Sequence, residues 1–126
     1  MRILLDTHIA LWAFAGSPRI EKVRDIILSP DTEIFVSVAS WWELAIKIGL
    51  GKLEADLKEL RWAAKESGFS ELPVRGEHTE YLQKLPPIHK DPFDRLMIAQ
   101  AMAEPMRFLT VDDKLEGYSE LVWRIR

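Results

Sequence analysis

Short continuous apolar runs alternate along the chain with stripes of apolar residues at helical spacing. The runs are bounded by turn-forming residues such as Gly, Pro, Ser and Asp, which is typical of buried strands. They predict strands at residues 2–5, 33–38, 69–74, 106–111 and 121–125.

The stripes between these runs predict helices. Apolar residues recur there every three to four positions, and Ser-Pro, Gly or Pro-Pro signals mark the ends. The last helix has a clear start, with Asp91 as the N-cap and Pro92 at its first position. The expected helices lie at about residues 9–15, 17–28, 40–48, 53–67, 77–85 and 91–104.

Strands separated by helices imply right-handed crossovers and a mainly parallel sheet covered on both faces. We therefore expect a three-layer α/β/α domain with a four- or five-stranded sheet, formed by residues 1–126 as one unit. In open sheets of this kind, ligands bind at the carboxyl ends of the strands, where the strand order reverses.

Composition narrows the function classes. The chain has no cysteine, which excludes disulfides, thiolate metal sites and cysteine nucleophiles. The formal net charge of −3 argues against a nucleic-acid binder that relies on overall charge, so a polyanionic substrate would need local basic residues or bound cations.

The first residues faintly resemble a signal peptide, because Arg2 precedes an apolar stretch with small residues near its end. Asp6 and His8 interrupt that stretch, and the apolar runs are far shorter than the ~20 residues of a membrane span. We therefore expect a cytoplasmic protein with no membrane association.

Four acidic residues are expected at the carboxyl edge of the sheet. Asp6 ends the first strand, and Asp112 ends the fourth. Glu43 is expected in the first turn of the helix after the second strand, and Asp94 in the first turn of a later helix. Since parallel strands end at the same edge, this placement favours a cation site.

Each acid also has a local explanation. Asp6 could cap the next helix, Asp112 and Asp113 could form a simple turn, and Ser40 with Glu43 has the spacing of a capping box, as Asp91 has with Asp94. These local roles do not account for four acids at one edge. An all-carboxylate set suits Mg²⁺ or Mn²⁺ rather than zinc, and magnesium sites are often completed by a substrate phosphate.

Four segments of the chain together resemble the PIN-domain ribonucleases, and among them the VapC-type toxins of bacterial and archaeal toxin–antitoxin pairs. They occur in the same order as in that family and span essentially the whole chain. The segments are LLDTH at residues 4–8, SWWELAIK at 40–47, HKDPFDRLMIAQA at 89–101 and LTVDD at 109–113, the third being the most specific.

The resemblance implies a metal-dependent endoribonuclease whose catalytic and metal-binding acids are Asp6, Glu43, Asp94 and Asp112. In that family, water activated by the cation attacks a phosphodiester in line and leaves 5′-phosphate and 3′-hydroxyl ends. The resemblance also implies an RNA substrate, a cognate antitoxin protein and a homodimer. It leaves open whether one or two ions bind.

Several neighbouring residues have two interpretations each. Thr7 and Thr110 could orient the acids through their hydroxyls or serve as ordinary caps. Of Trp41 and Trp42, one is expected in the core, and the other could stack on a base or contact a partner helix. The remaining tryptophans, Trp12, Trp62 and Trp123, are assigned to packing. The basic residues Lys47, His89, Lys90, Arg95 and Lys114 could contact the RNA backbone or be paired and solvated.

Two other function classes compete with a nuclease. A phosphoacceptor signalling domain requires paired acids after the first strand and an aspartate after the third, and neither is present. The second alternative is a catalytically silent module that keeps the fold and binds an antitoxin. The complete acid set argues against it, but a sequence does not measure activity, so this alternative stays open.

Overall fold

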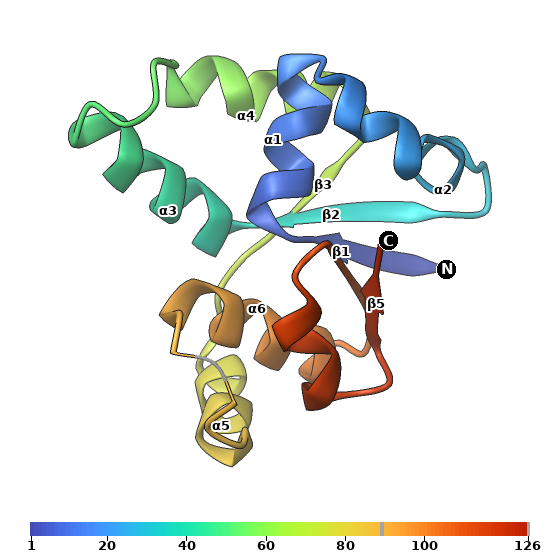
Figure 1. Ribbon diagram of the computed structural model, residues 1–126, viewed down its shortest axis with the longest axis vertical. Helices are drawn as coiled ribbons and strands as arrows, with labels where there is room; N and C mark the ends of the chain where they lie inside the picture. Colours follow the sequence, from blue (N-terminus) through green and yellow to red (C-terminus); the bar gives the residue numbers. More distant parts are fainter. Residues whose placement is uncertain (89, 126) are drawn as a thin grey trace.

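Five parallel strands form the centre of the protein, as seen in the computed structural model, which describes residues 1–88 and 90–125 (Figure 1). The strand order is β3-β2-β1-β4-β5, and the register pairs Leu4 with Phe35 on one side and with Phe108 on the other. The strands are β1 (Arg2–Leu5), β2 (Glu33–Ser37), β3 (Ser70–Leu72), β4 (Arg107–Thr110) and β5 (Val122–Arg124). The parallel sheet and its five strands confirm the predicted fold class.

Helices cover both faces of this sheet (Figure 1). One layer contains α1 (Thr7–Ala15), the 3₁₀ helix η1 (Pro18–Lys22), α2 (Arg24–Leu28), α3 (Val38–Gly49) and α4 (Leu57–Glu66). The other contains α5 (Gly76–Lys84), α6 (Pro92–Ala103) and the 3₁₀ helix η2 (Asp113–Tyr118). None of the helices in the described ranges is long and apolar enough to cross a membrane.

The side chains of β1 alternate between the two cores that these layers enclose. Leu4 packs into the core that contains Met97 of α6, whereas Ile3 and Leu5 pack into the core that contains Ile9 of α1. Because all three β1 side chains are fully buried, this strand reads as a continuous apolar run, as expected for the centre of a covered parallel sheet.

Two of the predicted helices differ from the structure. The stripe at residues 17–28 is divided at Val23, whose backbone leaves the helical region and whose side chain is buried, so that η1 and α2 replace one helix. The stripe that begins at Leu53 becomes helical only at Leu57, since the side chain of Asp56 caps α4 by accepting a hydrogen bond from the Lys58 N–H.

The strand order places the topological switch point at β1. The chain leaves β1 toward β2 on one side, and β4 later pairs with the other side of β1. The crevice outside the carboxyl ends of β1, β2 and β4 is where a doubly wound sheet binds its ligand. Asp6, directly after β1, lies at this position.

Candidate acidic site

Asp6 is held at the end of β1 by three hydrogen bonds. Its backbone N–H donates to the Leu109 carbonyl at 3.0 Å and so extends the pairing of β1 with β4. Its Oδ1 accepts from the Ile9 N–H at 3.0 Å, and its Oδ2 accepts from the Thr110 hydroxyl at 2.5 Å. Asp6 is therefore the N-cap of α1 and also a fixed carboxylate at the switch point.

Burial raises the pKa of Asp6 above its usual value. The side chain is only 3% exposed, and desolvation disfavours the charged form. The hydrogen bonds from Thr110 and Ile9 act in the opposite direction, although burial has the larger effect. A carboxylate in this setting gains from a nearby cation, which would favour its charged form.

Asp112 is connected to Asp6 through Thr110. The Thr110 hydroxyl donates to Asp6 and accepts from the Asp112 N–H at 3.1 Å. The Asp112 carboxylate accepts from the Lys114 N–H at 2.9 Å and caps η2. Asp112 is partly buried, whereas Asp113 is already the first residue of η2. The expected turn role and the expected position at the strand end are thus both present.

Glu43 lies one turn further along α3 than the sequence predicts. The helix begins at Val38, and its N-cap is Ser37, whose hydroxyl accepts from the Ala39 N–H at 3.0 Å. Ser40 is inside the helix and is fully buried, so the capping-box alternative for Ser40 and Glu43 is wrong, and so is the expectation that Glu43 lies in the first turn. The physical reason is that β2 runs directly into α3, and the last strand residue itself supplies the cap.

The Glu43 carboxylate is incompletely satisfied. Its Oε2 lies 3.4 Å from the Lys47 Nζ one turn later, and the side chain is 12% exposed. Its Oε1 is buried and has no hydrogen-bond partner among the described residues. A buried oxygen without a donor carries a free-energy cost, which makes this atom a ready ligand for a cation.

Asp94 is in the first turn of α6, as predicted, and Asp91 is the N-cap. The Asp91 Oδ1 accepts from the Phe93 N–H at 2.8 Å and from the Asp94 N–H at 3.0 Å. These bonds use the Asp91 carboxylate for the helix start, and the Asp94 side chain is partly buried at the same end of α6. The prediction that Asp91 serves as the helix cap is confirmed.

Two contacts fix α3 against α6 near Glu43 and Asp94. The Ser40 hydroxyl lies 3.3 Å from the Met97 sulfur, and it also shares a 2.9 Å hydrogen bond with the Thr7 hydroxyl. Trp42 and Phe93 meet edge to face, with ring centroids 4.9 Å apart. Thr7 therefore supports α3 rather than an acid, while Thr110 does orient an acid.

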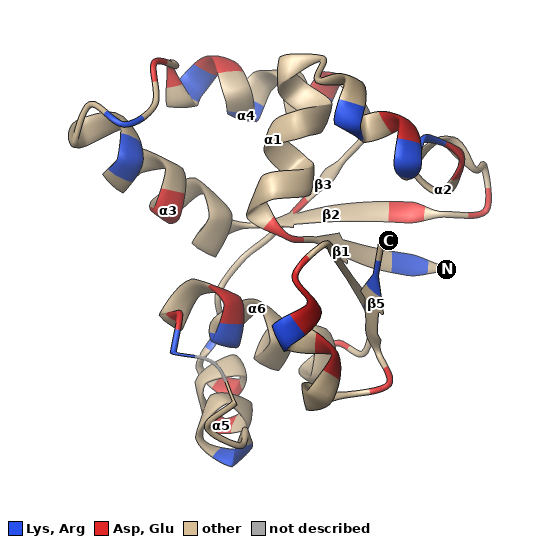
Figure 2. Ribbon diagram, viewed as in Figure 1, with Lys and Arg blue, Asp and Glu red and all other residues tan. Residues whose placement is uncertain are grey.

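The four acids belong to the same edge of the sheet but do not form a compact cluster. Acidic positions appear on α3, at the start of α6 and in the segment after β4, around the end of β1 (Figure 2). No three of the four bring ligand atoms within 4.8 Å of one another. Magnesium keeps several waters and can reach some of its ligands through them, so it does not require a closer cluster.

The residues at this edge fit a divalent cation on two observations. The Asp6 carboxylate is desolvated beyond what its hydrogen bonds offset, and the Glu43 Oε1 is buried without a donor. Both are hard oxygen ligands, as Mg²⁺ and Mn²⁺ prefer. Asp94 and Asp112 would complete an all-carboxylate set.

The basic residues near the site have different surroundings. Arg95 donates from Nη1 to the Pro86 carbonyl at 2.9 Å and to the Tyr118 hydroxyl at 3.1 Å, so it ties η2 to the loop before α6. Lys47 pairs with Glu43. Lys90 and Lys114 are exposed, and His89 lies outside the described residues.

The two adjacent tryptophans of α3 divide as expected. Trp41 is 5% exposed and stacks on Phe14, with centroids 5.7 Å apart, whereas Trp42 is 59% exposed. Trp12 and Trp123 are partly buried against the core, as predicted. The assignment of Trp62 to packing is wrong, because its side chain is 65% exposed on α4.

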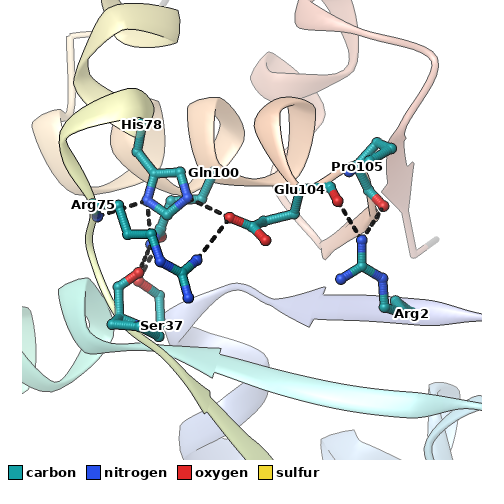
Figure 3. A network of polar contacts seen from close by, with 8 residues as sticks. Arg2, Ser37, Arg75, His78, Gln100, Glu104 and Pro105 are labelled. Carbon is teal, nitrogen blue, oxygen red and sulfur yellow. Dashed lines mark hydrogen bonds and ion pairs between the residues drawn. The ribbon is translucent and has the colours of Figure 1, made fainter.

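A buried polar network on the α5–α6 side was not foreseen from the sequence (Figure 3). The Ser37 hydroxyl donates to Gln100 Oε1 at 2.6 Å, and the Gln100 side-chain amide lies 3.4 Å from His78 Nδ1. Since Ser37 caps α3 and Gln100 lies on α6 six residues after Asp94, the network links the two helices that carry Glu43 and Asp94. The only signal in the sequence is a polar residue inside the apolar stretch 97–101.

His78 connects this network to a carboxylate. Its Nδ1 accepts from the Arg75 N–H at 2.9 Å, which leaves the proton on Nε2, 2.6 Å from Glu104 Oε2. Glu77, His78 and Glu104 each bring one potential ligand atom within 4.8 Å of the others. Because both ring nitrogens of His78 are already used in hydrogen bonds, this group is a structural junction.

Comparisons with known proteins agree on one family. Residues 3–121 match the model of the PIN domain family. The chain is similar to Ribonuclease VapC22 of Mycobacterium tuberculosis, with 25% identity over 92% of this chain and 91% of that protein.

Solved structures show the same fold. One is VapBC2 from Rickettsia felis bound to a DNA fragment from its promoter, with a TM-score of 0.75, 18% identity and full coverage of both chains. Another is a toxin–antitoxin complex from Klebsiella pneumoniae, with a TM-score of 0.66, 19% identity and 98% coverage of both chains. A domain of a functionally unknown protein from Methanocaldococcus jannaschii has a TM-score of 0.58, with 18% identity, covering 99% of this chain and 91% of that chain.

Proposed function

Because the chain belongs to the PIN domain family, we propose that it is a metal-dependent endoribonuclease whose catalytic acids are Asp6, Glu43, Asp94 and Asp112. It hydrolyses RNA phosphodiester bonds with Mg²⁺ or Mn²⁺ as cofactor and leaves 5′-phosphate and 3′-hydroxyl ends. The similarity to a protein named as a ribonuclease supports the substrate class.

One observation carries this proposal: the switch-point edge holds buried carboxylate oxygens that a bound cation would stabilise. Asp6 is buried with a raised pKa, and Glu43 Oε1 is buried without a partner among the described residues. Like-charged groups brought to one edge repel each other, and a bound cation would offset both this repulsion and the cost of burying their charge.

The protein's own residues position the reaction. A divalent cation bound at this edge supplies an activated water and neutralises charge on the phosphate. The Thr110 hydroxyl holds the Asp6 carboxylate, and the Asp112 backbone is fixed to the same hydroxyl. Glu43 and Asp94 are held by the packing of α3 on α6. This rigid support keeps the acids from turning away from the phosphate.

We further propose that a cognate antitoxin protein inhibits the nuclease, that the active form is a homodimer and that it acts in the cytoplasm. The structural neighbours include toxin–antitoxin complexes, which supports a protein partner of this kind. A small DNA-binding protein encoded immediately upstream would be the candidate. Its coexpression should suppress RNA cleavage by the wild-type chain.

The test compares the wild type with Asp94→Asn and with Asp25→Asn, an exposed acid on α2 that serves as a matched control. RNA cleavage is measured in Mg²⁺, in Mn²⁺ and in chelator, and the chemical groups at the ends of the RNA products are identified. We expect cleavage by the wild type and by Asp25→Asn in either metal, and none by Asp94→Asn or in chelator.

Equal cleavage by Asp94→Asn and the wild type, or cleavage that is indifferent to chelator, would refute the mechanism. A folded wild type that leaves RNA intact in both metals would instead favour a catalytically silent PIN-fold interaction module.

A further inference from the structure

We propose that the hollow between α3 and α4 binds one unpaired base of the RNA, with Trp42 as the stacking wall and the Arg61–Glu71 pair as the group that reads the base edge. This inference rests on the proposed function, because it assigns a base-binding subsite to the same nuclease.

The hollow has the size and lining of a small-ligand site. It is an open depression of about 320 Å³, and its apolar surface includes Val38, Trp41, Ala45 and Leu57. Trp42 is a further part of the lining, and Arg61 and Glu71 are its charged part. This volume is at the low end for small-molecule pockets and is enough for a single planar group.

Trp42 joins this hollow to the acidic edge. Its ring is 59% exposed, and its position is fixed by the edge-to-face contact with Phe93. Trp42 directly precedes Glu43, and Phe93 directly precedes Asp94. A base stacked on Trp42 would therefore belong to a nucleotide close to the phosphate that the acids address.

The Arg61–Glu71 pair offers both donors and acceptors at the hollow. Arg61 Nε lies 2.9 Å from Glu71 Oε1, and Arg61 Nη2 lies 3.1 Å from Glu71 Oε2. This two-point pairing fixes both side chains and leaves other N–H groups of Arg61 and lone pairs of Glu71 available. A base presents a mixed donor and acceptor edge, which such a pair can match.

The charge of the protein favours stacking as the source of binding energy. The chain has a net charge of −3, and the proposed catalytic edge of the sheet carries four acids. Long-range attraction of the RNA backbone is therefore weak. Stacking on an exposed aromatic ring does not depend on charge, and it suits unpaired bases of any kind.

The experiment uses metal-free protein in chelator, so that binding is measured without cleavage. The probe is a short labelled single-stranded oligoribonucleotide, and a second probe has one base removed from the same backbone. Trp42→Ala should weaken binding of the first probe by about 5- to 100-fold, which is the range for loss of one stacked base. Trp42→Phe should restore most of the affinity.

Trp62→Ala is the matched control, since Trp62 is equally exposed, at 65%, on the neighbouring helix α4 and does not line the hollow. It should bind both probes like the wild type. The abasic probe should bind the wild type and Trp42→Ala equally. Exchange of the charged pair, Arg61→Glu with Glu71→Arg, should change the relative affinities of oligomers of the four bases.

Equal losses in Trp42→Ala and Trp62→Ala, or a Trp42→Ala loss that persists with the abasic probe, would overturn the proposal. So would a Trp42→Ala variant that binds RNA normally but no longer forms the homodimer or no longer binds the antitoxin, because Trp42 would then belong to a protein interface. If Trp42→Ala binds the oligoribonucleotide like the wild type and still cleaves RNA in a metal-dependent reaction, the subsite is rejected and the nuclease proposal stays intact.

Discussion

Thr110 donates its hydroxyl proton to Asp6 across the boundary between β4 and β1, over a distance of 2.5 Å. The same oxygen accepts the Asp112 N–H, so one buried hydroxyl fixes the Asp6 carboxylate and the backbone of Asp112 at the ends of two paired strands. A pair of acids held in this way needs little rearrangement to bind a cation, because their orientation is set by the fold.

Thr110→Val keeps the shape of the side chain and removes both hydrogen bonds. We expect a folded protein whose RNA cleavage, or affinity for Mg²⁺, falls about 10- to 100-fold, as is usual when a supporting partner of a ligand is lost. The cleavage rate as a function of Mg²⁺ concentration measures both effects.

Thr110→Ser is the control for this variant, since it retains the hydroxyl and should keep most of the activity. If Thr110→Val and Thr110→Ser cleave RNA equally well at low Mg²⁺, the hydroxyl does not support the site.

Asp6→Asn should stabilise the metal-free protein near neutral pH. Burial raises the pKa of Asp6 in the folded state. Its contribution to the free energy of unfolding is therefore fully present below the usual pKa of 3.8, where the carboxyl is protonated, and is lost as the pH rises through the raised pKa. We therefore expect the variant to have a higher free energy of unfolding than the wild type above the raised pKa, because its neutral side chain carries no charge to bury. Urea unfolding in chelator across this pH range measures it.

The prediction concerns the difference in the free energy of unfolding between Asp6→Asn and the wild type, because the other carboxyl groups are the same in both proteins. Mg²⁺ should stabilise the wild type more than the variant. A variant that is less stable than the wild type at neutral pH in chelator would show that the cap on α1 outweighs the burial of the charge.

Glu104 should make the opposite contribution to the pH dependence. The hydrogen bond from His78 lowers the pKa of Glu104, and Arg75 acts in the same direction. Stability from this group is therefore present above its usual value of 4.5 and is lost as the pH falls through the lowered pKa. Glu104→Gln should be less stable at neutral pH and lose less on acidification. If the free energy of unfolding differs between the two proteins by the same amount at every pH, this assignment is contradicted.

Much of the fold follows from local pattern, because the two central strands β1 and β4 are buried on both faces and read as apolar runs. The position of Asp94 was predictable for a related reason: Asp91 and Pro92 define where α6 begins, and the structure shows that cap. Asp6 and Asp112 follow directly from the ends of their strands. In all three cases a neighbouring residue in the sequence determines the position.

Glu43 could not be placed correctly because its helix has two serines that can cap it. Ser40 with Glu43 has the better local pattern, but Ser37 becomes the cap because the strand ends there. The Ser37 hydroxyl is also held by Gln100, 63 residues away in the sequence. Long-range contacts of this kind leave no local signal.

Trp62, by contrast, was predictable from the helical period. Leu57, Leu60 and Ala64 face the core from α4, and a residue two positions after Leu60 points about 200° away from it. The size of the side chain suggested burial, whereas the spacing required exposure. The period is therefore the better guide where the two disagree.

Gln100→Leu tests whether the network in Figure 3 positions the acids as well as stabilising the fold. The variant leaves the Ser37 hydroxyl without its acceptor in a buried site, which should cost about 1–3 kcal/mol of the free energy of unfolding. Because Gln100 is on the same helix as Asp94, we also expect RNA cleavage by the folded variant to require a higher Mg²⁺ concentration. Gln83→Leu, at an exposed position of α5, should change neither property. If Gln100→Leu loses stability but cleaves RNA with an unchanged Mg²⁺ dependence, the network supports the fold alone.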